Sequence, residues 1–194
     1  MACILCIETA TTNCSVALSV NGSVIAFRED SSKGYSHAEK LHVFIAEVLQ
    51  EAAIEKSEIQ AIAVSKGPGS YTGLRIGVSA AKGLCYALDI PLISVETLRV
   101  LVQQVSGKGT IVPMLDARRM EVYVAVFNEN REEMRGTKAE ILTPTSFLNF
   151  LDEGQTIFIG DGVSKFEAIC DHANAKFVRD TLPSAKDMAI LAVE

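Results

Sequence analysis

Two short segments combine residue types that could bind a nucleotide's phosphates. Glu8-Thr9-Ala10-Thr11-Thr12 follows an apolar segment and places a carboxylate beside several hydroxyl groups. Gly67-Pro68-Gly69-Ser70 follows a second apolar segment and precedes a helical pattern, so its backbone N–H groups and the helix dipole could hold an anion. The candidate phosphate-binding residues are therefore Glu8, Thr9, Thr11, Gly67 and Gly69, together with Asp116, which occupies the place of Glu8 in the second half of the chain.

Both segments also have a purely structural interpretation. Threonine hydroxyls commonly satisfy backbone groups in turns, and Ser70 could cap the following helix. The glycine segment lacks the Lys-Ser/Thr pair of a P-loop and does not fit G-x-G-x-x-G, so neither phosphate-binding fingerprint applies. The pattern alone leaves a nucleotide site and a structural turn as alternatives.

The histidines do not predict a metal centre or a catalytic triad. His37 and His42 are five residues apart, which separates them by roughly 140° around a helix, so they do not converge on one ion. A capping or surface role is the simpler interpretation of both. His172 has no companion histidine, and no Ser-His-Asp or Cys-His set can be assembled.

The elements that must position these residues occur twice in the same order. The first half predicts strands at 4–7, 15–20, 24–27, 61–64 and 91–95, with helices at 36–53, 71–88 and 97–105. The second half predicts strands at 110–115, 121–127, 134–142 and 156–159, with helices at 145–151 and 163–171. An internal duplication of an α/β unit accounts for this order.

We therefore predict two lobes, 1–108 and 109–194, each a mixed sheet with helices packed on it. Gly107-Lys108-Gly109 is the expected boundary between them. The apolar segment 189–193 reaches the end of the sequence without a helix C-cap. We expect the last helix of the second lobe to continue or to be covered by a partner.

Composition excludes several classes of protein. The 194 residues include 18 Lys+Arg and 24 Asp+Glu, which gives a net charge of −6. This charge disfavours a domain that binds nucleic acid by phosphate neutralisation alone. The hydrophobic fraction of 48% disfavours disorder, and no apolar run is long enough to span a bilayer. With no signal peptide and five cysteines mostly within apolar segments, we expect a soluble, cytoplasmic protein.

The expected helix 71–88 is apolar or small over most of its circumference. Its polar residues form one narrow stripe: Arg75, Ser79, Lys82 and Tyr86. Such a helix must be covered on two sides, one of them by its own sheet. Either the neighbouring helix 36–53 or a partner protein could cover the other side.

Four blocks of sequence resemble the TsaB (YeaZ) family: Ile7–Thr11, Ser36–Leu41, Gly67–Gly77 and Leu115–Tyr123. The resemblance implies a duplicated actin-like, Hsp70-like or sugar-kinase fold. It also implies a role in forming N6-threonylcarbamoyladenosine at position 37 of tRNAs that read ANN codons. In this family TsaD is the catalyst, TsaB is its non-catalytic heterodimer partner, and the ATPase TsaE joins them.

The same resemblance implies roles for particular residues. The two metal-binding histidines of TsaD correspond to Thr97 and Leu101, which are not strong ligands, so no metal is expected here. Family members pair with TsaD, or with a second copy of themselves, through the helices 37–53 and 71–88. The residues expected at that interface are His42, Val43, Ala46, Gly73, Ile76, Gly77, Ala80 and Gly83.

Other expectations concern ligands. No tightly bound cofactor is expected, although ATP or ADP could bind at the interface of the complex. tRNA is expected only as part of that complex, with Arg118 and Arg119 as candidates for a composite basic surface. The competing functions are a nucleotide-dependent kinase or ATPase that uses Glu8 and Asp116, and a glycoprotease-type metallopeptidase.

Overall fold

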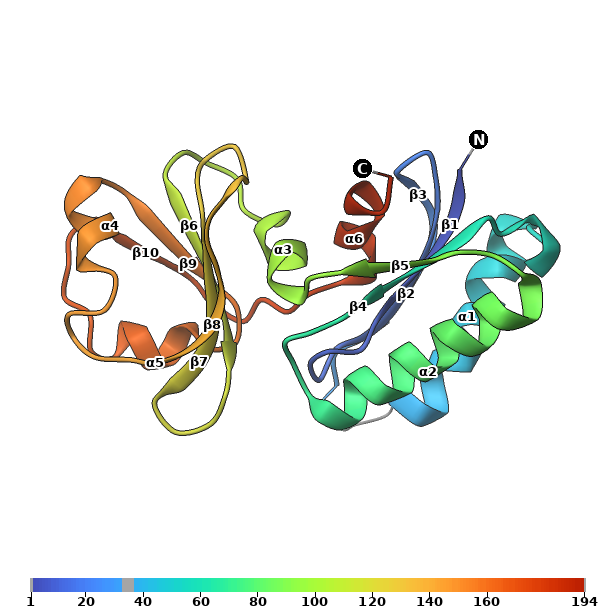
Figure 1. Ribbon diagram of the computed structural model, residues 1–194, viewed down its shortest axis with the longest axis horizontal. Coiled ribbons are helices and arrows are strands. Elements are labelled where there is room, and N and C mark those ends of the chain that lie inside the picture. The colour runs from blue at the N-terminus through green and yellow to red at the C-terminus, as the bar shows by residue number, and fades with distance from the viewer. Residues whose placement is uncertain (1, 33–36, 194) are drawn as a thin grey trace. The chain divides into compact units, whose positions relative to one another are not determined.

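The computed structural model describes residues 2–32 and 37–193, which form two compact units (Figure 1). The first unit is drawn from the chain up to residue 100 and from residue 183 onward, and the second comprises residues 101–182. Ser36, which begins both a predicted helix and one of the four sequence blocks, lies outside the described residues. None of the helices in the described ranges is both long and apolar enough to cross a bilayer.

The first unit contains one five-stranded sheet with helices on both faces. Its strands are β1 (Cys3–Glu8), β2 (Cys14–Val20), β3 (Ser23–Asp30), β4 (Ala61–Ser65) and β5 (Leu92–Val95). Its helices are α1 (His37–Ala52), the short 3₁₀ turn η1 (Lys56–Glu58), α2 (Tyr71–Leu88) and α6 (Ala185–Leu191). The division between the units falls within α3 (Thr97–Val102).

The second unit contains another five-stranded sheet with shorter helices. Its strands are β6 (Thr110–Asp116), β7 (Glu121–Phe127), β8 (Glu133–Ile141), β9 (Thr156–Ile159) and β10 (Ala175–Val178). Its helices after the boundary are α4 (Leu148–Glu153) and α5 (Val163–Glu167). Four phenylalanines, with ring centroids 4.8–6.3 Å apart, fill part of its core: Phe147, Phe158, Phe166 and Phe177.

The two sheets share one topology. The strand order is β3-β2-β1-β4-β5 in the first and β10-β9-β6-β7-β8 in the second, so each unit's first strand is central. That strand pairs antiparallel with the second strand and parallel with the fourth in both units. This repetition confirms the predicted duplicated α/β fold.

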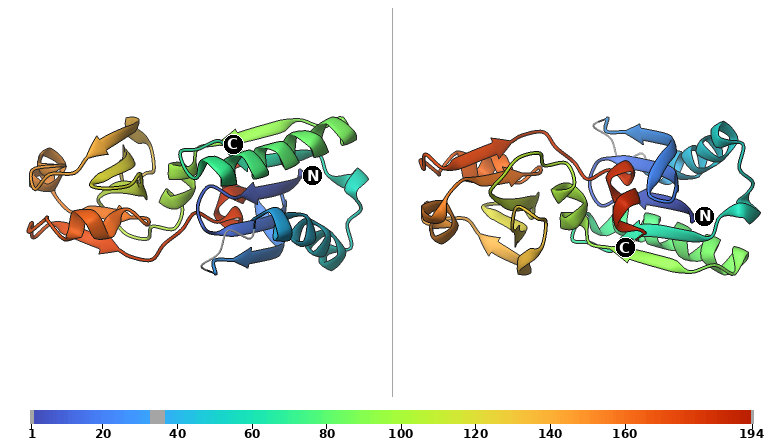
Figure 2. Two further views of the ribbon diagram at one scale, coloured as in Figure 1. Left: turned by 90° about the horizontal axis from the view of Figure 1, so that it is seen from below. Right: turned by 90° about the horizontal axis from the view of Figure 1, so that it is seen from above.

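α1 and α2 pack on one face of the first sheet, and α6 packs on the other (Figures 1 and 2). The buried stripe of α1 follows the predicted helical spacing, with Leu41, Ile45 and Val48 in the core. Cys3 and Cys6 belong to the cores on opposite faces of this sheet, as the alternation of strand residues predicts. Both cysteines are free thiols.

The predicted lobe boundaries differ from the structure in two places. The division falls between residues 100 and 101, within α3, rather than at 107–109. The predicted second lobe, 109–194, also includes α6, whereas α6 packs against β1, β2 and β3 of the first unit. Ala185, Met188 and Ala189 are buried there, because the second face of the first sheet is apolar and requires cover. The backbone N–H of Ala185 also donates to Ser15 Oγ at 2.9 Å.

The second unit departs from the predicted elements in two places. β10 was not predicted, because its four residues alternate between half-buried and exposed at a sheet edge and carry little apolar signal. α5 ends at Glu167 rather than at 171, and the following residues form turn hydrogen bonds such as Ile169 N–H to Phe166 C=O at 3.0 Å.

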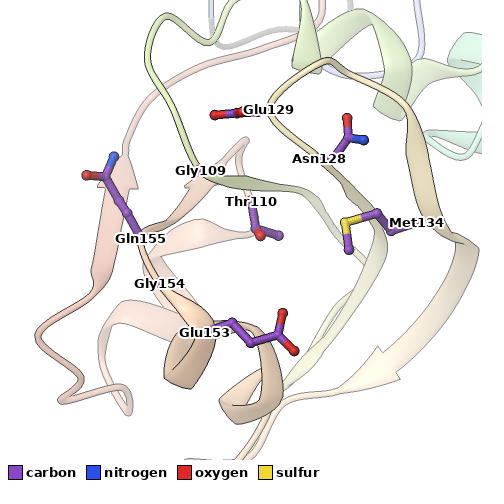
Figure 3. Close-up of a pocket in the computed structure, with 8 residues that line it drawn as sticks. All are labelled: Gly109, Thr110, Asn128, Glu129, Met134, Glu153, Gly154 and Gln155. Carbon is purple, nitrogen blue, oxygen red and sulfur yellow. The ribbon is translucent and has the colours of Figure 1, made fainter.

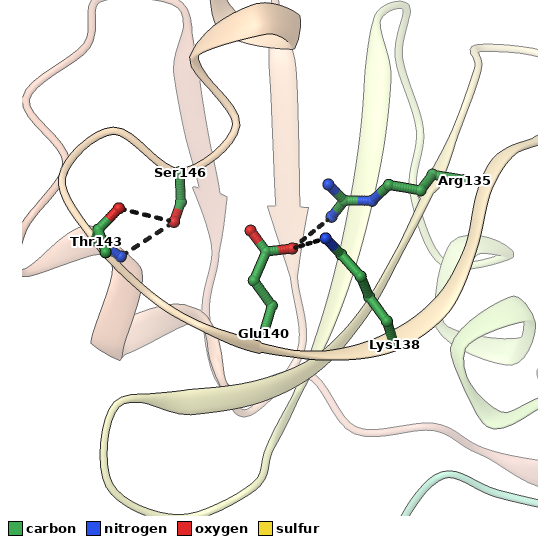
Figure 4. Close-up of polar contacts among 5 residues, drawn as sticks. All are labelled: Arg135, Lys138, Glu140, Thr143 and Ser146. Atoms are coloured by element: carbon green, nitrogen blue, oxygen red, sulfur yellow. Dashed lines mark hydrogen bonds and ion pairs between the residues drawn. The ribbon is translucent and has the colours of Figure 1, made fainter.

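Charged side chains protect the exposed edge strand β8 from pairing with another chain. Glu140 accepts a hydrogen bond from Arg135 at 2.9 Å and forms an ion pair with Lys138 at 3.0 Å (Figure 4). The Arg135 guanidinium also lies 5.1 Å from the centre of the Phe147 ring, so it covers part of the second unit's core. Beyond this strand, Ser146 Oγ accepts from the Thr143 backbone N–H at 3.0 Å and fixes the turn toward α4.

Candidate functional site

The turn after β1 meets the end of β4, since these two strands are parallel neighbours. The Glu8 carboxylate is fully buried there. One of its oxygens accepts from the Ala10 backbone N–H at 2.7 Å, and the other accepts from the Ser65 hydroxyl. Burial raises the pKa of Glu8 to about 7, against the opposing effect of its hydrogen bonds to Ser65, Ala10 and Thr9.

The glycines of α2 seat this helix directly on the turn. Thr9 Oγ1 donates to the Gly73 carbonyl oxygen at 2.8 Å, and the Ser70 N–H donates to the Ala10 carbonyl oxygen at 2.6 Å. A Cβ at Gly73 would overlap the carbonyl oxygen of Thr9, and one at Gly77 would overlap its hydroxyl. These positions need glycine because the helix backbone lies against the turn.

α1 is joined to the same turn by His37. Its side chain is buried, and Nε2 lies 2.8 Å from the carbonyl oxygen of Thr11. Of the predicted capping or surface role, the surface position is found for His42, which is exposed, and not for His37. The turn thus contacts both long helices of the first unit.

The predicted phosphate-binding residues of the first unit come together, but their side chains face the interior. Glu8 and Thr9 are buried and hydrogen-bonded within the chain, and Thr11 is only 7% exposed. Gly69 packs against the Ala10 backbone, while Gly67 C=O accepts from the Thr97 N–H at 3.0 Å. This arrangement supports the structural interpretation of the turn, and a nucleotide at the interface of a complex stays a prediction.

Asp116 belongs to the second unit and is more open. Its carboxylate is 44% exposed, pairs with Lys165 at 2.9 Å and accepts from the Arg118 N–H at 2.6 Å. Asp116 is the last residue of β6, as Glu8 is the last residue of β1, so the two positions match as predicted. The kinase or ATPase alternative loses support from Glu8, because that carboxylate is buried and engaged.

α1 and α2 each carry exposed residues of mixed polar and apolar type. We call the outer helix face the following set of exposed residues: His42, Val43 and Ala46 of α1, with Tyr71, Arg75, Ser79, Lys82, Gly83 and Tyr86 of α2. Val43 is 50% exposed, Tyr71 74% and Tyr86 93%. Large apolar side chains at this exposure on adjacent helices are typical of an interaction surface.

The structure divides the predicted interface residues into three groups. His42, Val43, Ala46 and Gly83 are exposed, and no atom lies within 4 Å of a Cβ placed at Gly83. Ile76 and Ala80 are half-buried and pack on the first unit's core. Gly73 and Gly77 are buried against Thr9 within the chain, so they are not among the exposed residues of these helices.

Tyr71 was not predicted as a surface residue, although it is exposed. The Arg75 guanidinium lies 5.3 Å from the centre of the Tyr71 ring, and Arg75 Nη1 donates to the Tyr71 hydroxyl at 3.3 Å. Their spacing of four residues, which places two side chains on one helix face, is the signal that could have found this pair.

Thr97 and Leu101 are both buried on α3. Across the described ranges, no cluster of three or more His, Cys, Asp or Glu side chains is arranged to hold a metal ion.

A separate hollow of about 270 Å³ lies in the second unit (Figure 3). Its lining comprises Gly109, Thr110, Asn128, Glu129, Met134, Glu153, Gly154 and Gln155. Asn128 and Gln155 already donate to Glu132 at 2.7 Å and to the Lys108 carbonyl oxygen at 3.1 Å. None of the predicted site residues lines this hollow.

Comparison with known proteins identifies the class. A family model described as "TsaD: tRNA N6-adenosine threonylcarbamoyltransferase" matches residues 31–191, which is most of the chain. The fold and this match together define a member of the TsaD-related class of tRNA-modification proteins.

Individual relatives identify the family within that class. The Escherichia coli "tRNA threonylcarbamoyladenosine biosynthesis protein TsaB" is 30% identical over 201 residues, covering 98% of this chain and 86% of the relative. The Bacillus subtilis protein of the same name is 36% identical over 127 residues, covering 64% of this chain and 54% of the relative. The structure of "YeaZ from Pseudomonas aeruginosa" superposes with a TM-score of 0.83 at 28% identity, covering 100% of this chain and 90% of that one. The chain belongs to the TsaB family, which acts in tRNA threonylcarbamoyladenosine biosynthesis.

Two glycines of α2 should respond oppositely to the same substitution. Gly77→Ala places a methyl group against the Thr9 hydroxyl and should destabilise the protein by roughly 1–3 kcal/mol. Gly83→Ala enters open space in a helix interior and should stabilise it by about 0.5–1 kcal/mol. Chemical denaturation of both variants measures this difference, and equal effects would contradict the packing of α2 on the turn.

Glu8 should make stability depend on pH. Its folded pKa of about 7 lies above the ordinary 4.5, so the folded protein retains a proton that the unfolded chain has lost. The free energy of unfolding should therefore fall as pH rises from about 4.5 to 7, by up to about 3 kcal/mol. Glu8→Gln keeps the hydrogen-bonding shape without titrating, so the variant should lose this decline. Parallel stability–pH curves for the two proteins would refute the assignment.

Proposed function

We propose that this chain is the non-catalytic heterodimer partner of a TsaD-type subunit. In that complex it would serve the formation of N6-threonylcarbamoyladenosine at position 37 of tRNAs that read ANN codons. The observation that carries the proposal is the outer helix face, where Val43, Tyr71 and Tyr86 are exposed on two adjacent helices.

The composition of this face suits a specific protein contact. Tyrosine and arginine are enriched in binding hot spots, and the Tyr71–Arg75 pair presents both. Ala46 and Gly83 carry little or no side chain, so a partner helix could approach closely beside these larger residues. A specific complex typically buries about 800 Å² on each partner, an area that two helices can provide.

The two residues that correspond to TsaD's metal ligands favour a non-catalytic role for this chain. Leu101 has no donor atom, and the neutral Thr97 hydroxyl is a weak ligand that is buried in this chain. We accordingly assign the chemical step to TsaD. TsaE would join the pair, ATP or ADP would bind at the interface of the complex, and tRNA would bind only to the assembled complex. When alone, this chain would pair with a second copy through the same face.

Charge placed on the outer helix face should weaken the pairing with TsaD. Val43→Glu should reduce the affinity for the TsaD of the same organism by at least about tenfold, because the carboxylate would be desolvated in the interface. Val178→Glu is a matched control, since Val178 is 40% exposed on the edge strand of the second unit. Calorimetric titration of each variant tests this expectation, and equal loss in both would exclude the outer helix face as the contact.

Loss of the chain in cells should remove the modified nucleoside. We expect depletion followed by mass spectrometry of tRNA nucleosides to show loss of threonylcarbamoyladenosine. Normal levels should return with the wild-type gene and with V178E, whereas V43E should restore them only in part. Retention of the nucleoside after depletion would overturn the proposed function.

A further inference from the structure

The hairpin between β6 and β7 presents two adjacent arginines that the fold does not use. Arg118 and Arg119 are exposed, and neither guanidinium has a hydrogen-bond or ion-pair partner within residues 2–32 and 37–193. Other arginines of this acidic chain are paired: Arg28 with Glu47 at 2.9 Å, and Arg179 with Glu167. Two free guanidiniums side by side are available for an external anion.

The backbone that carries these arginines is fixed on several sides. Asp116 accepts from the Arg118 N–H at 2.6 Å and pairs with Lys165. Lys165 also donates to the Glu121 carbonyl oxygen at 3.1 Å, and the Glu121 N–H donates to the Arg118 carbonyl oxygen at 3.0 Å. On the other side, the Leu142 N–H donates to the Met120 carbonyl oxygen at 2.8 Å. The tip is therefore held rigidly while its two long side chains remain free.

The conformation of the tip is unfavourable for these residue types. Arg118 has a φ of 72° and Arg119 a φ of 47°, both in the left-handed region that glycine and asparagine adopt most readily. Hairpin turns with successive residues at positive φ usually carry Asn-Gly. The sequence places two arginines here instead, and strained positions of this kind concentrate at binding sites.

We propose that Arg118 and Arg119 contact phosphate groups of the tRNA backbone in the assembled complex. Guanidinium groups bind phosphate through paired hydrogen bonds, and such contacts position a nucleic acid without reading its sequence. Two contacts are compatible with the net charge of −6, because they orient RNA that the complex as a whole binds. This inference rests on the proposed function, since that function supplies the tRNA.

The test measures tRNA binding to the complex of this chain with TsaD. The probe is an unmodified transcript of an ANN-reading tRNA. Its binding to the complex is measured by fluorescence anisotropy at salt concentrations between 50 and 200 mM. Each phosphate contact adds roughly 0.7–0.9 to the slope of log affinity against log salt, so R118A/R119A should lower that slope by about 1.4–1.8. The corresponding loss of affinity at 100 mM salt is about 25- to 60-fold.

Three further variants separate the contact from general effects. K108A/K176A removes the same charge from exposed positions of the second unit and should leave the slope unchanged. R118K/R119K keeps both charges and should retain most of the slope. R118N/R119G suits the left-handed backbone, so it should melt at or above the wild-type temperature and yet lose the same part of the slope.

The outcomes distinguish the inference from the proposed function. If the wild-type complex binds tRNA and R118A/R119A binds with the same affinity and slope, the inference is overturned alone. If R118A/R119A weakens assembly with TsaD but not tRNA binding, the tip contacts an acidic protein surface and the inference is also overturned. If the wild-type chain does not assemble with TsaD, the proposed function fails and this inference fails with it.

Discussion

The packing of α2 on the turn after β1 determines how the first unit presents its surface. Because Gly73 and Gly77 have no Cβ, the helix backbone rests on Thr9, and the hydroxyl of Thr9 donates to the Gly73 carbonyl oxygen. His37 joins α1 to the same turn. One buried turn therefore fixes the positions of both helices on the sheet. The placement of the outer helix face depends on these positions.

The duplication places two versions of one topology in the same chain, with different uses. In the first unit the central strand ends in a buried, hydrogen-bonded carboxyl at Glu8. In the second unit the matching Asp116 is half-exposed and braces an arginine-bearing hairpin. The helices differ as well, since α1 and α2 have 16 and 18 residues whereas α4 and α5 have six and five. Among the described residues, helices of this length occur in the first unit and not in the second.

The positions of most strands along the chain and the opposite faces of Cys3 and Cys6 followed from sequence periodicity, because a buried sheet enforces alternation. The contact of the α2 glycines with the turn did not follow from the sequence. A stripe of small residues is compatible with a helix that packs on another helix as well as with one that packs on a turn. The burial of Glu8 could not be predicted either, since a carboxyl at the end of a strand is compatible with either a cleft or the interior. The return of α6 to the first sheet depends on long-range packing, which a local pattern does not contain.

That return of α6 has a consequence for synthesis on the ribosome. The second face of the first sheet is closed by Ala185, Met188 and Ala189, which emerge after the whole second unit has been made. Until then, apolar side chains such as Ile4 and Ala17 lack part of their cover. The second unit, whose residues are contiguous, can complete its core first, so the N-terminal portion of this polypeptide is the last to be finished and the one most exposed to chaperones and proteases during translation.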